Sequence, residues 1–335
     1  MGCIGKQTIL FKEPPVIINA YSSAGPKEQQ GTLGQYFDNK MPDELLGEDS
    51  WEKAEARMIQ QTVQGLLDRA RKLPSDIQYI FAGDLQNQVV ASTFGLKDFN
   101  IPFFGLYGAC STMGESMSLA SMMIAGGMAD IVIAGTSSHY CAAEKQFRFP
   151  LEYAGQRTMA QHWTVTGSGF VLLSRSGEGP CVTGITTGKI VDLGITDTFN
   201  MGAAMAPAAV DTILTHLEDT NQKPSDFDAI YTGDLGNWGV DIANELAKKS
   251  GVDLSHVLND CGKMIFDDEK QETNAGGSGC GCSAAVFTGY LYKQMLKKKL
   301  KKILLVPTGA LMSTGSSQQG NTIPGIAHAV CIEMK

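Results

Sequence analysis

The sequence predicts an α/β protein made of two similar halves. Short apolar runs of strand length alternate with longer segments whose apolar residues recur at helical spacing. Part of this pattern occurs twice, because residues 74–87 and 224–237 share Pro, Ser, Asp, Ile, Gly, Asp, Leu and Asn at equivalent positions. With 335 residues, 43% of them hydrophobic, the chain is long enough for two fused halves with a large shared core.

The first half alternates strands and helices from its start. In chain order we expect strands at 8–11 and 16–19, a polar excursion over 24–50, a helix over 51–73, a strand over 77–82, a buried strand over 101–107 and a closing strand over 166–174. The run of small residues over 116–129 is expected to be helical.

The second half repeats the first. Cys110-Ser111 and Thr136 recur with constant spacing as Cys282-Ser283 and Thr308, and extra length falls near residues 260–272. We therefore expect halves at 1–178 and 179–335, each with the order βαβαβαββ, joined as one compact unit. Their mainly parallel sheets should enclose helices in an α/β/α/β/α sandwich with a pseudo-twofold axis.

The stretch Gly108-Ala109-Cys110-Ser111-Thr112 is expected to turn from a strand into a helix. A helix N-terminus lowers the pKa of a thiol and attracts anions, so Cys110 suits either a nucleophile or a contact to an acidic ligand. The plain alternative is a small buried hydrophobic side chain. Strand ends also carry Asp84, Asp234, Asn237 and His139, and ligands of open α/β sheets bind at that edge.

Composition argues against several classes of protein. The net charge is -8, and the only dense basic run is 297–302, so a nucleic-acid partner is not expected. That run is interpreted as a solvated turn before a strand at 303–306, with contact to an anionic membrane as the alternative. Eight cysteines without a CxxC pair indicate a reducing compartment, and Cys280-Gly281-Cys282 lacks a second ligand pair, so neither a metal nor a cofactor is expected.

The sequence contains neither a signal-peptide pattern at its start nor an apolar run that would span a bilayer. Any association with a membrane should therefore come through partner proteins or surface contacts.

The chain resembles the thiolase superfamily, which includes the ketoacyl synthases. Three stretches carry the likeness: the nucleophile turn at 108–112, the strand at 166–174 and the terminal strand at 329–333. The resemblance implies a thiolase-like fold. In enzymes of this superfamily the cysteine is acylated, and His together with Asn, His or Cys activates it and holds the thioester oxygen.

This sequence departs from the catalytic pattern of that superfamily. Asp234 stands where the resemblance expects a histidine, and Gly281 stands at the expected asparagine. A carboxylate beside a thiol opposes thiolate formation, so the resemblance implies a site without the usual condensation chemistry. His139 and His328 have a plausible path to the pocket, and His328 is either a substitute base or a core residue. The remaining histidines, His162, His216 and His256, are expected in loops or on helix surfaces.

Within the superfamily, the chain resembles most the stage V sporulation AD family of endospore-forming bacteria. The matching stretches are 5–8, 23–28, 82–88, 136–139, 144–150, 192–197 and 205–209. This resemblance implies a homodimeric, non-enzymatic protein without a cofactor. It would bind dipicolinic acid (pyridine-2,6-dicarboxylate) and act with other stage V sporulation A membrane proteins at the inner membrane of the spore or forespore.

The expected ligand-binding residues are Cys110, Asp84, His139, Arg148, Asp234, Asn237 and His328. A planar aromatic dianion needs anion donors and a flat slot, and Arg148 or Arg157 could supply the cation. Arg148 could instead pair with Glu144 or Glu152, or lie at a dimer interface. Two other functions stay open: an acyl-CoA-dependent condensing or acyltransferase enzyme with Cys110 as nucleophile, and a mainly architectural protein.

Overall fold

The computed structural model describes residues 2–147 and 157–334. Its main strands form two half-sheets with the same pattern. In sheet order the first half-sheet contains β3 (Val16–Ala24), β9 (Gly167–Ser174), β7 (Ile131–Ser138), β5 (Tyr79–Gly83) and β6 (Phe103–Leu106). The second contains β10 (Pro180–Thr186), β17 (Ala329–Met334), β14 (Lys302–Val306), β11 (Ala229–Thr232) and β12 (Leu258–Asp260). The duplication read from the sequence is therefore present in the strand order.

Both half-sheets are mixed but mainly parallel, as expected, because four strands of each run in one direction and one strand is reversed. In the first, β5 pairs parallel with β6 and β7, but β9 runs antiparallel to both β7 and β3. The second repeats this with β17 as the antiparallel strand. Residues 139–166 lead from β7 to β9, and residues 307–328 lead from β14 to β17. Connections of this length do not reveal from the sequence in which direction the next strand runs.

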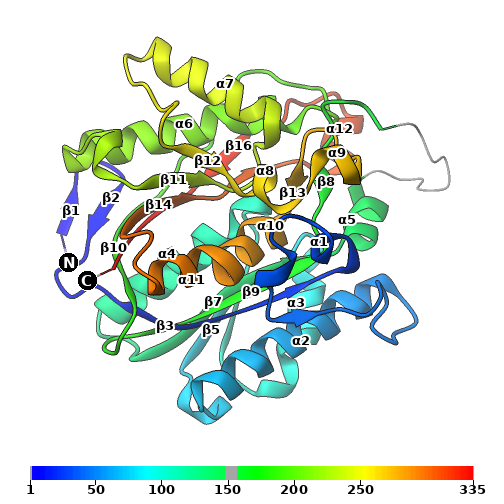
Figure 1. Cartoon of the computed structure of the whole chain (residues 1–335), viewed down its shortest axis with the longest axis vertical. Helices are drawn as coiled ribbons and strands as arrows, with labels where there is room; N and C mark the ends of the chain where they lie inside the picture. Colours follow the sequence, from blue (N-terminus) through cyan, green and yellow to red (C-terminus); the bar gives the residue numbers. More distant parts are fainter. Residues whose placement is uncertain (1, 148–156, 335) are drawn as a thin grey trace.

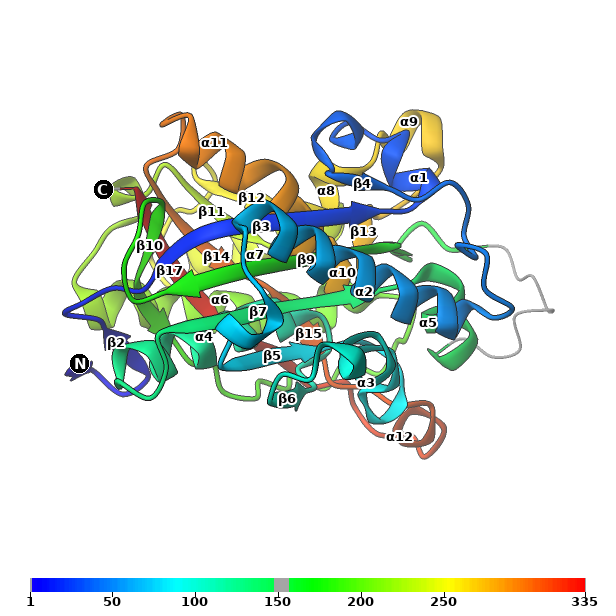
Figure 2. The same ribbon diagram turned by 90° about the horizontal axis from the view of Figure 1, so that it is seen from below.

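Helices cover both faces of each half-sheet (Figures 1 and 2). The outer helices are α2 (Trp51–Ala70) and α3 (Val90–Leu96) on the first half-sheet, and α6 (Met201–Thr220) and α7 (Gly236–Lys249) on the second. The inner helices are α4 (Thr112–Ala125) and α10 (Cys280–Val286), the latter continuing through a π-helical turn into α11 (Tyr292–Leu296). This is the expected α/β/α/β/α sandwich, and its core consists of one apolar cluster between the half-sheets and one under each outer layer.

The remaining elements are short. They are β1 (Gly2–Ile4), β2 (Thr8–Leu10), α1 (Pro26–Gln29), β4 (Asn39–Lys40), α5 (Tyr140–Phe147), β8 (Trp163–Thr164), α8 (Cys261–Ile265), α9 (Asp268–Gln271), β13 (Gly277–Ser278), β15 (Thr308–Ala310), α12 (Thr314–Gln318) and β16 (Gly325–Ala327). The division proposed at residue 178 falls in the turn between β9 and β10. Among the described helices, none combines the length and the apolar composition needed to cross a membrane.

Strand β6 is not the buried strand that its apolar sequence predicted. It lies at the edge of its half-sheet, and Phe104 is 48% exposed. The ring of Phe104 stacks on that of Phe81, with centroids 4.9 Å apart. One side of the Phe104 ring therefore covers Phe81, and the other side is exposed to solvent.

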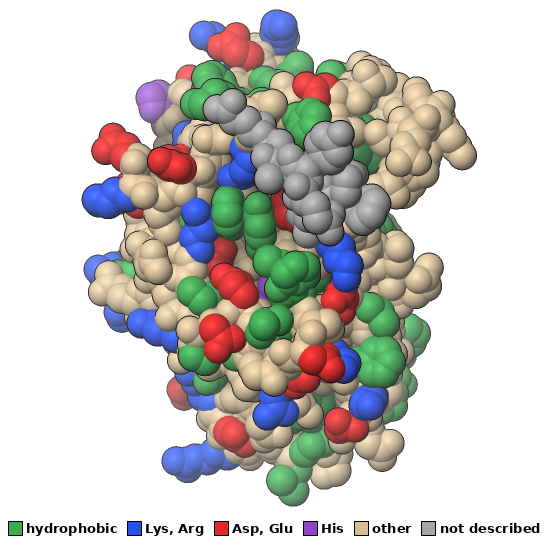
Figure 3. Space-filling model, turned by 90° about the vertical axis from the view of Figure 1, so that its right-hand side faces the viewer, with side chains coloured by type: hydrophobic (Ala, Val, Ile, Leu, Met, Phe, Trp, Pro, Cys, Tyr) green, Lys and Arg blue, Asp and Glu red, His purple; other side chains and the backbone are tan. Residues whose placement is uncertain are grey.

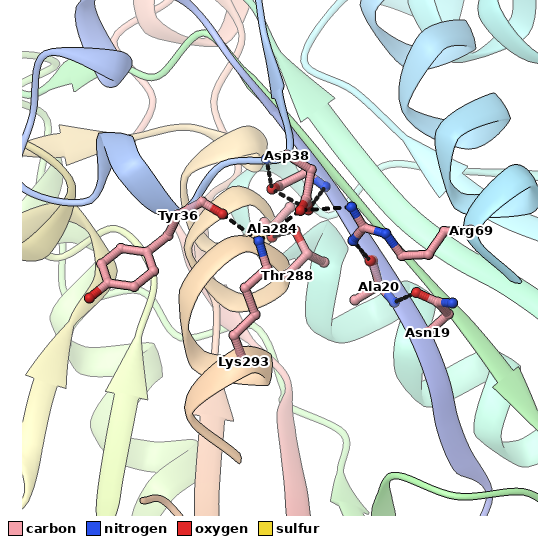
Figure 4. Close-up of polar contacts among 9 residues, drawn as sticks. Asn19, Ala20, Tyr36, Asp38, Arg69, Ala284, Thr288 and Lys293 are labelled. Carbon is pink, nitrogen blue, oxygen red and sulfur yellow. Dashed lines mark hydrogen bonds and ion pairs between the residues drawn. The ribbon is translucent and has the colours of Figure 1, made fainter. Parts of the chain in front are cut away.

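Asp38 fixes the polar excursion to both halves of the core (Figure 4). Its side chain is 7% exposed and accepts hydrogen bonds from Arg69 of α2 at 2.8 Å, Lys293 of α11 at 2.7 Å and the backbone and hydroxyl of Ser22 at 3.0 Å. Burial acts to raise the pKa of Asp38, but the contacts to Arg69 and Lys293 outweigh it and leave that pKa lowered. Lys293 also donates to the carbonyl of Tyr36.

Asp38→Asn should lower the free energy of unfolding by roughly 2–3 kcal/mol, because Arg69 and Lys293 lose their shared anion but remain partly solvated. The contribution of the Asp38 charge is present above the ordinary pKa of aspartate, and it is lost as the pH falls through the lowered value. Urea denaturation at pH 7 measures the difference. The matched control is Asp49→Asn, which removes an exposed pair with Lys53 and should change nothing measurable; equal effects of both variants would contradict this role for Asp38.

Candidate functional site

Cys110 lies in a single 3₁₀ turn (Ala109–Ser111) directly before α4, as the sequence predicted. Ala109 has a φ of 48°, a left-handed conformation that costs a residue with a side chain about 1–2 kcal/mol. The thiol of Cys280, from the second half, donates to the carbonyl of Ala109 at 2.9 Å. A strained turn is therefore held in place by the opposite half, with the Cys110 side chain partly exposed.

The Cys110 thiol is protonated at neutral pH. Burial and the nearby Asp234 carboxyl raise its pKa, and these effects outweigh contacts to the Ser278 hydroxyl, 3.8 Å away, and to the backbone of Gly279. The sequence indicated two opposing effects on this pKa, and the direction observed is the one expected from a carboxylate beside the thiol. The favourable field of the helix end is smaller than the cost of placing a thiolate in a poorly solvated position beside an acid.

Asp234 is fully buried beside the thiol. Burial and the neighbouring Asp260 raise the pKa of Asp234 well above its ordinary value, against weaker effects from Cys110 and from the backbone of Gly279 and Thr308. Asp234 therefore holds its proton more tightly than a solvated aspartate does, and in its protonated form the carboxyl can donate a hydrogen bond.

Asp260 holds the loop that carries Asp234. Its carboxylate accepts hydrogen bonds from the amides of Leu235 and Gly236 at 2.9 and 3.0 Å. It also accepts from the Thr232 hydroxyl at 2.7 Å and caps α8 through the amide of Lys263. This network fixes the position of Asp234, and no local sequence pattern predicts it.

An aromatic and cationic cluster lies beside Ser278. Strand β13 pairs with β8, so Trp163 and Thr164 run alongside Gly277 and Ser278. The Trp163 ring stacks on Tyr140 at 4.0 Å, with Lys27 and Arg157 at 3.9 and 4.7 Å from its centroid. The sequence named Arg157 as a possible cation, but it did not predict Lys27 or Ser278.

These strands lie on the side of the molecule that carries α5. Figure 3 shows this face, where hydrophobic side chains gather between acidic and basic ones. The surface next to the cluster is therefore amphipathic.

Asp84 and Asn237 make structural contacts. The Asp84 carboxylate accepts from the backbone amides of Gln86 and Ser92 at 2.9 and 2.7 Å, which orders its own loop. The Asn237 amide donates to Asp268 at 2.8 Å, which ties α7 to α9. These hydrogen bonds show why turn residues at strand ends resemble ligand-binding groups in a sequence, since both uses need the same polar side chains.

The candidate histidines also bond to the backbone. His139 Nε2 donates to the carbonyl of Glu44 at 2.8 Å, and burial lowers the His139 pKa. His328 Nδ1 accepts from the amide of Gly188 at 3.3 Å, and burial lowers the His328 pKa to about 4. Arg148, the remaining candidate, lies outside the described residues.

Two other histidines do not lie where the sequence predicted them. His162 and His216 are buried rather than on the surface, bonding to the Leu235 carbonyl at 3.0 Å and the Thr186 hydroxyl at 2.8 Å. Within the ranges 2–147 and 157–334, no cluster of His, Cys, Asp or Glu side chains could hold a metal ion.

Glu28, next to Lys27, is a buried acid. It accepts from the amide of Thr166 at 3.0 Å, and burial raises its pKa to about 8. Because the folded chain holds this proton more tightly than the unfolded chain, its stabilising effect is complete below about pH 4.5 and is lost as the pH rises toward 8.

Glu28→Gln should therefore flatten the decline in stability between about pH 5 and pH 8, by as much as about 1.4 kcal/mol per pH unit. Urea denaturation at several pH values measures this slope. Glu245→Gln on the exposed surface of α7 is the matched control and should keep the wild-type slope. A Glu28→Gln slope identical to that of the wild type would show that Glu28 is ionised in the folded chain.

Cys110 should react with iodoacetamide at pH 8 at least about a hundredfold more slowly than the exposed Cys3, because alkylation requires the thiolate. Peptide mapping by mass spectrometry measures both rates in one sample. Asp234→Asn should accelerate Cys110 only a few-fold, since burial is the larger cause of the raised pKa. Equal rates for Cys110 and Cys3 would contradict the protonation state assigned here.

Comparison with known proteins agrees with this fold. A family model described as "Stage V sporulation protein AD (SpoVAD)" matches residues 5–333. A protein named Stage V sporulation protein AD from Bacillus subtilis (strain 168) is 43% identical over 333 residues, which cover 99% of this chain and 98% of that protein.

Solved structures of condensing enzymes share the architecture at low sequence identity. The 3-oxoacyl-[acyl-carrier-protein] synthase III of Aquifex aeolicus matches with a TM-score of 0.55 and 14% identity, over 95% of this chain and 99% of its own. OleA of Xanthomonas campestris matches with a TM-score of 0.61 and 11% identity, over 97% and 98%. These likenesses confirm the thiolase-like fold expected from the sequence. By its sequence, the chain belongs to the stage V sporulation protein AD family.

Proposed function

We propose that this chain binds dipicolinic acid without transforming it and helps to load it into the developing spore. The proposal includes a homodimer that acts with other stage V sporulation A membrane proteins, attached peripherally to the inner membrane of the spore or forespore. Membership of a sporulation family supports the setting. The chemistry around Cys110 supports the choice of binding over catalysis.

The observation that carries the proposal is the buried Asp234 carboxyl beside the Cys110 thiol, an arrangement that raises the pKa of both groups. Condensation by this fold needs a thiolate, whereas burial and Asp234 raise the pKa of Cys110. His328 would be a weak base with a pKa of about 4, and its Nδ1 is occupied by Gly188. A cysteine in this setting is better suited to contact a ligand than to attack one.

The same groups suit a planar dianion. An ionised carboxylate at Asp234 would repel dipicolinate, but a protonated one can donate a hydrogen bond to it. Lys27 and Arg157, which lie over the Trp163 ring, supply two positive charges near the strand that carries Ser278. A ligand with two carboxylates on a rigid aromatic ring could pair with both of these cations.

Titration calorimetry of the full chain with pyridine-2,6-dicarboxylate should therefore give a measurable heat of binding. Lys27→Gln should weaken binding by roughly tenfold, the size expected for one charge-assisted hydrogen bond. Cys110→Ala and Arg148→Ala should also weaken it. The matched control is Lys97→Gln, which alters an exposed lysine after α3 and should bind like the wild type.

Pyridine-2-carboxylate, which lacks one carboxylate, should bind more weakly than the dicarboxylate. Absence of any heat at millimolar dipicolinate would overturn the proposal.

The condensing-enzyme alternative makes a different prediction for the same protein. Incubation with acyl-CoA thioesters should leave the mass of Cys110 unchanged, because a protonated thiol attacks a thioester slowly. Mass spectrometry of the intact chain decides this. A stable acyl adduct on Cys110 that disappears in Cys110→Ala would favour the enzyme.

A further inference from the structure

The dense lysine run forms a compact cationic surface. Residues 297–301 join α11 to β14 at the end of the molecule that carries β1 and β2, opposite to α5 (Figures 1 and 2). Lys297, Lys298, Lys299 and Lys301 are all exposed, and no ion pair to them is present within the described part of the chain. We call these four side chains the lysine surface.

The lysine surface contrasts with the rest of the protein. The chain carries a net charge of -8, so four unpaired lysines on one short turn give this end a charge opposite to that of the whole. One acid lies close: Asp228 is exposed and accepts from the backbone amides of Lys301 and Lys302. The four positive charges therefore exceed the acid that faces them directly.

The backbone of the turn directs these lysines outward. Helix α11 ends at Leu296, and the amides of Lys298 and Lys299 bond back to Met295 and Gln294 at 2.8 and 3.0 Å. Lys298 has a φ of 56°, where glycine is the relaxed choice. Leu296 directly precedes Lys297 and is 46% exposed. An apolar side chain therefore lies at the surface beside the lysines.

A hollow next to the turn extends this surface. It has a volume of about 750 Å³, and its lining includes the cations Lys298, Lys12 and Arg175 together with the acids Glu13 and Glu178. Because Arg175 is paired with Asp130 at 2.6 Å and two acids share the lining, this hollow extends the positive charge only through Lys298 and Lys12.

We propose that the lysine surface docks this protein on an anionic phospholipid bilayer, with Leu296 entering the headgroup region. Lysine ammonium groups on flexible stems act as point charges toward a fluid anionic surface, whereas an acidic protein segment is better matched by arginine forks. A single exposed leucine among lysines is also the composition of a reversible interfacial contact. This inference rests on the proposed function, in which the protein is attached to a membrane, and adds the protein surface and the lipid chemistry of that attachment.

The test is co-sedimentation of the full chain with vesicles of phosphatidylglycerol and phosphatidylcholine (3:7) or of phosphatidylcholine alone. The protein should bind the anionic vesicles, ignore the neutral ones and dissociate as salt is raised. Each lysine should contribute about fivefold, so that replacing all four by glutamine weakens binding by at least about a hundredfold. Leu296→Ser should weaken it by a smaller factor.

The matched control replaces Lys97, Lys248, Lys249 and Lys263 by glutamine. These lysines are exposed and lie on other elements, and both quadruple variants lower the net charge by the same amount. The control should bind vesicles within about twofold of the wild type. Equal loss in both variants, unchanged binding in the lysine-surface variant, or equal binding to neutral vesicles would each overturn the proposal.

Lys298→Gly separates charge from folding. Glycine relaxes the left-handed position, so this variant should unfold at the same or higher urea concentration and still bind vesicles more weakly. Calorimetry of the quadruple variant with dipicolinate should match the wild type, so failure of membrane docking and failure of ligand binding give different results.

Discussion

Close contact between the backbones of the two halves determines the geometry of the candidate site. A Cβ atom on Gly281 would lie 2.3 Å from the carbonyl oxygen of Gly167, and one on Gly309 would lie 2.3 Å from that of Gly108. Only glycine allows helix α10 and strand β15 to approach the first half so closely. Because Gly309 packs on the turn before Cys110, the position of that thiol depends on the contact between the halves and not on its own half alone.

The sequence predicted what repeats or follows local periodicity. Pro74-Ser75-Asp76 and Pro224-Ser225-Asp226 form equivalent 3₁₀ turns, and the strands after them occupy equivalent places in their half-sheets. The direction of β9 and the exposure of β6 could not be read in the same way. Both depend on which strands become neighbours, and an apolar run has the same composition at the edge of a sheet as in its centre.

The candidate site could be predicted only in part, for a related reason. Cys110 and Asp234 stood out because each follows a strand in a turn, and the structure brings them together. Asp84 and Asn237 stood out for the same reason, but their hydrogen bonds go to their own loop and to a neighbouring helix. The contact between Cys110 and Ser278 joins residues far apart in the chain, so no local pattern announces it.

The chemistry of this site depends on two buried acidic groups, the Asp234 carboxyl and the Cys110 thiol. In a poorly solvated position a carboxyl keeps its proton, and a thiol beside it does the same. The solved condensing enzymes share this architecture, yet a fold does not determine chemistry; the protonation states of a few side chains do. Here burial raises the pKa of both Cys110 and Asp234, which favours the protonated forms that can donate hydrogen bonds.

The stack of Tyr140 on Trp163 makes the neighbourhood of Lys27 optically visible. Two rings 4.0 Å apart and inclined by 12° couple their electronic transitions, which produces a signal in near-ultraviolet circular dichroism. An ammonium 3.9 Å from the indole centroid also perturbs its fluorescence. Displacement of Lys27 would therefore change the spectrum of the protein without any label.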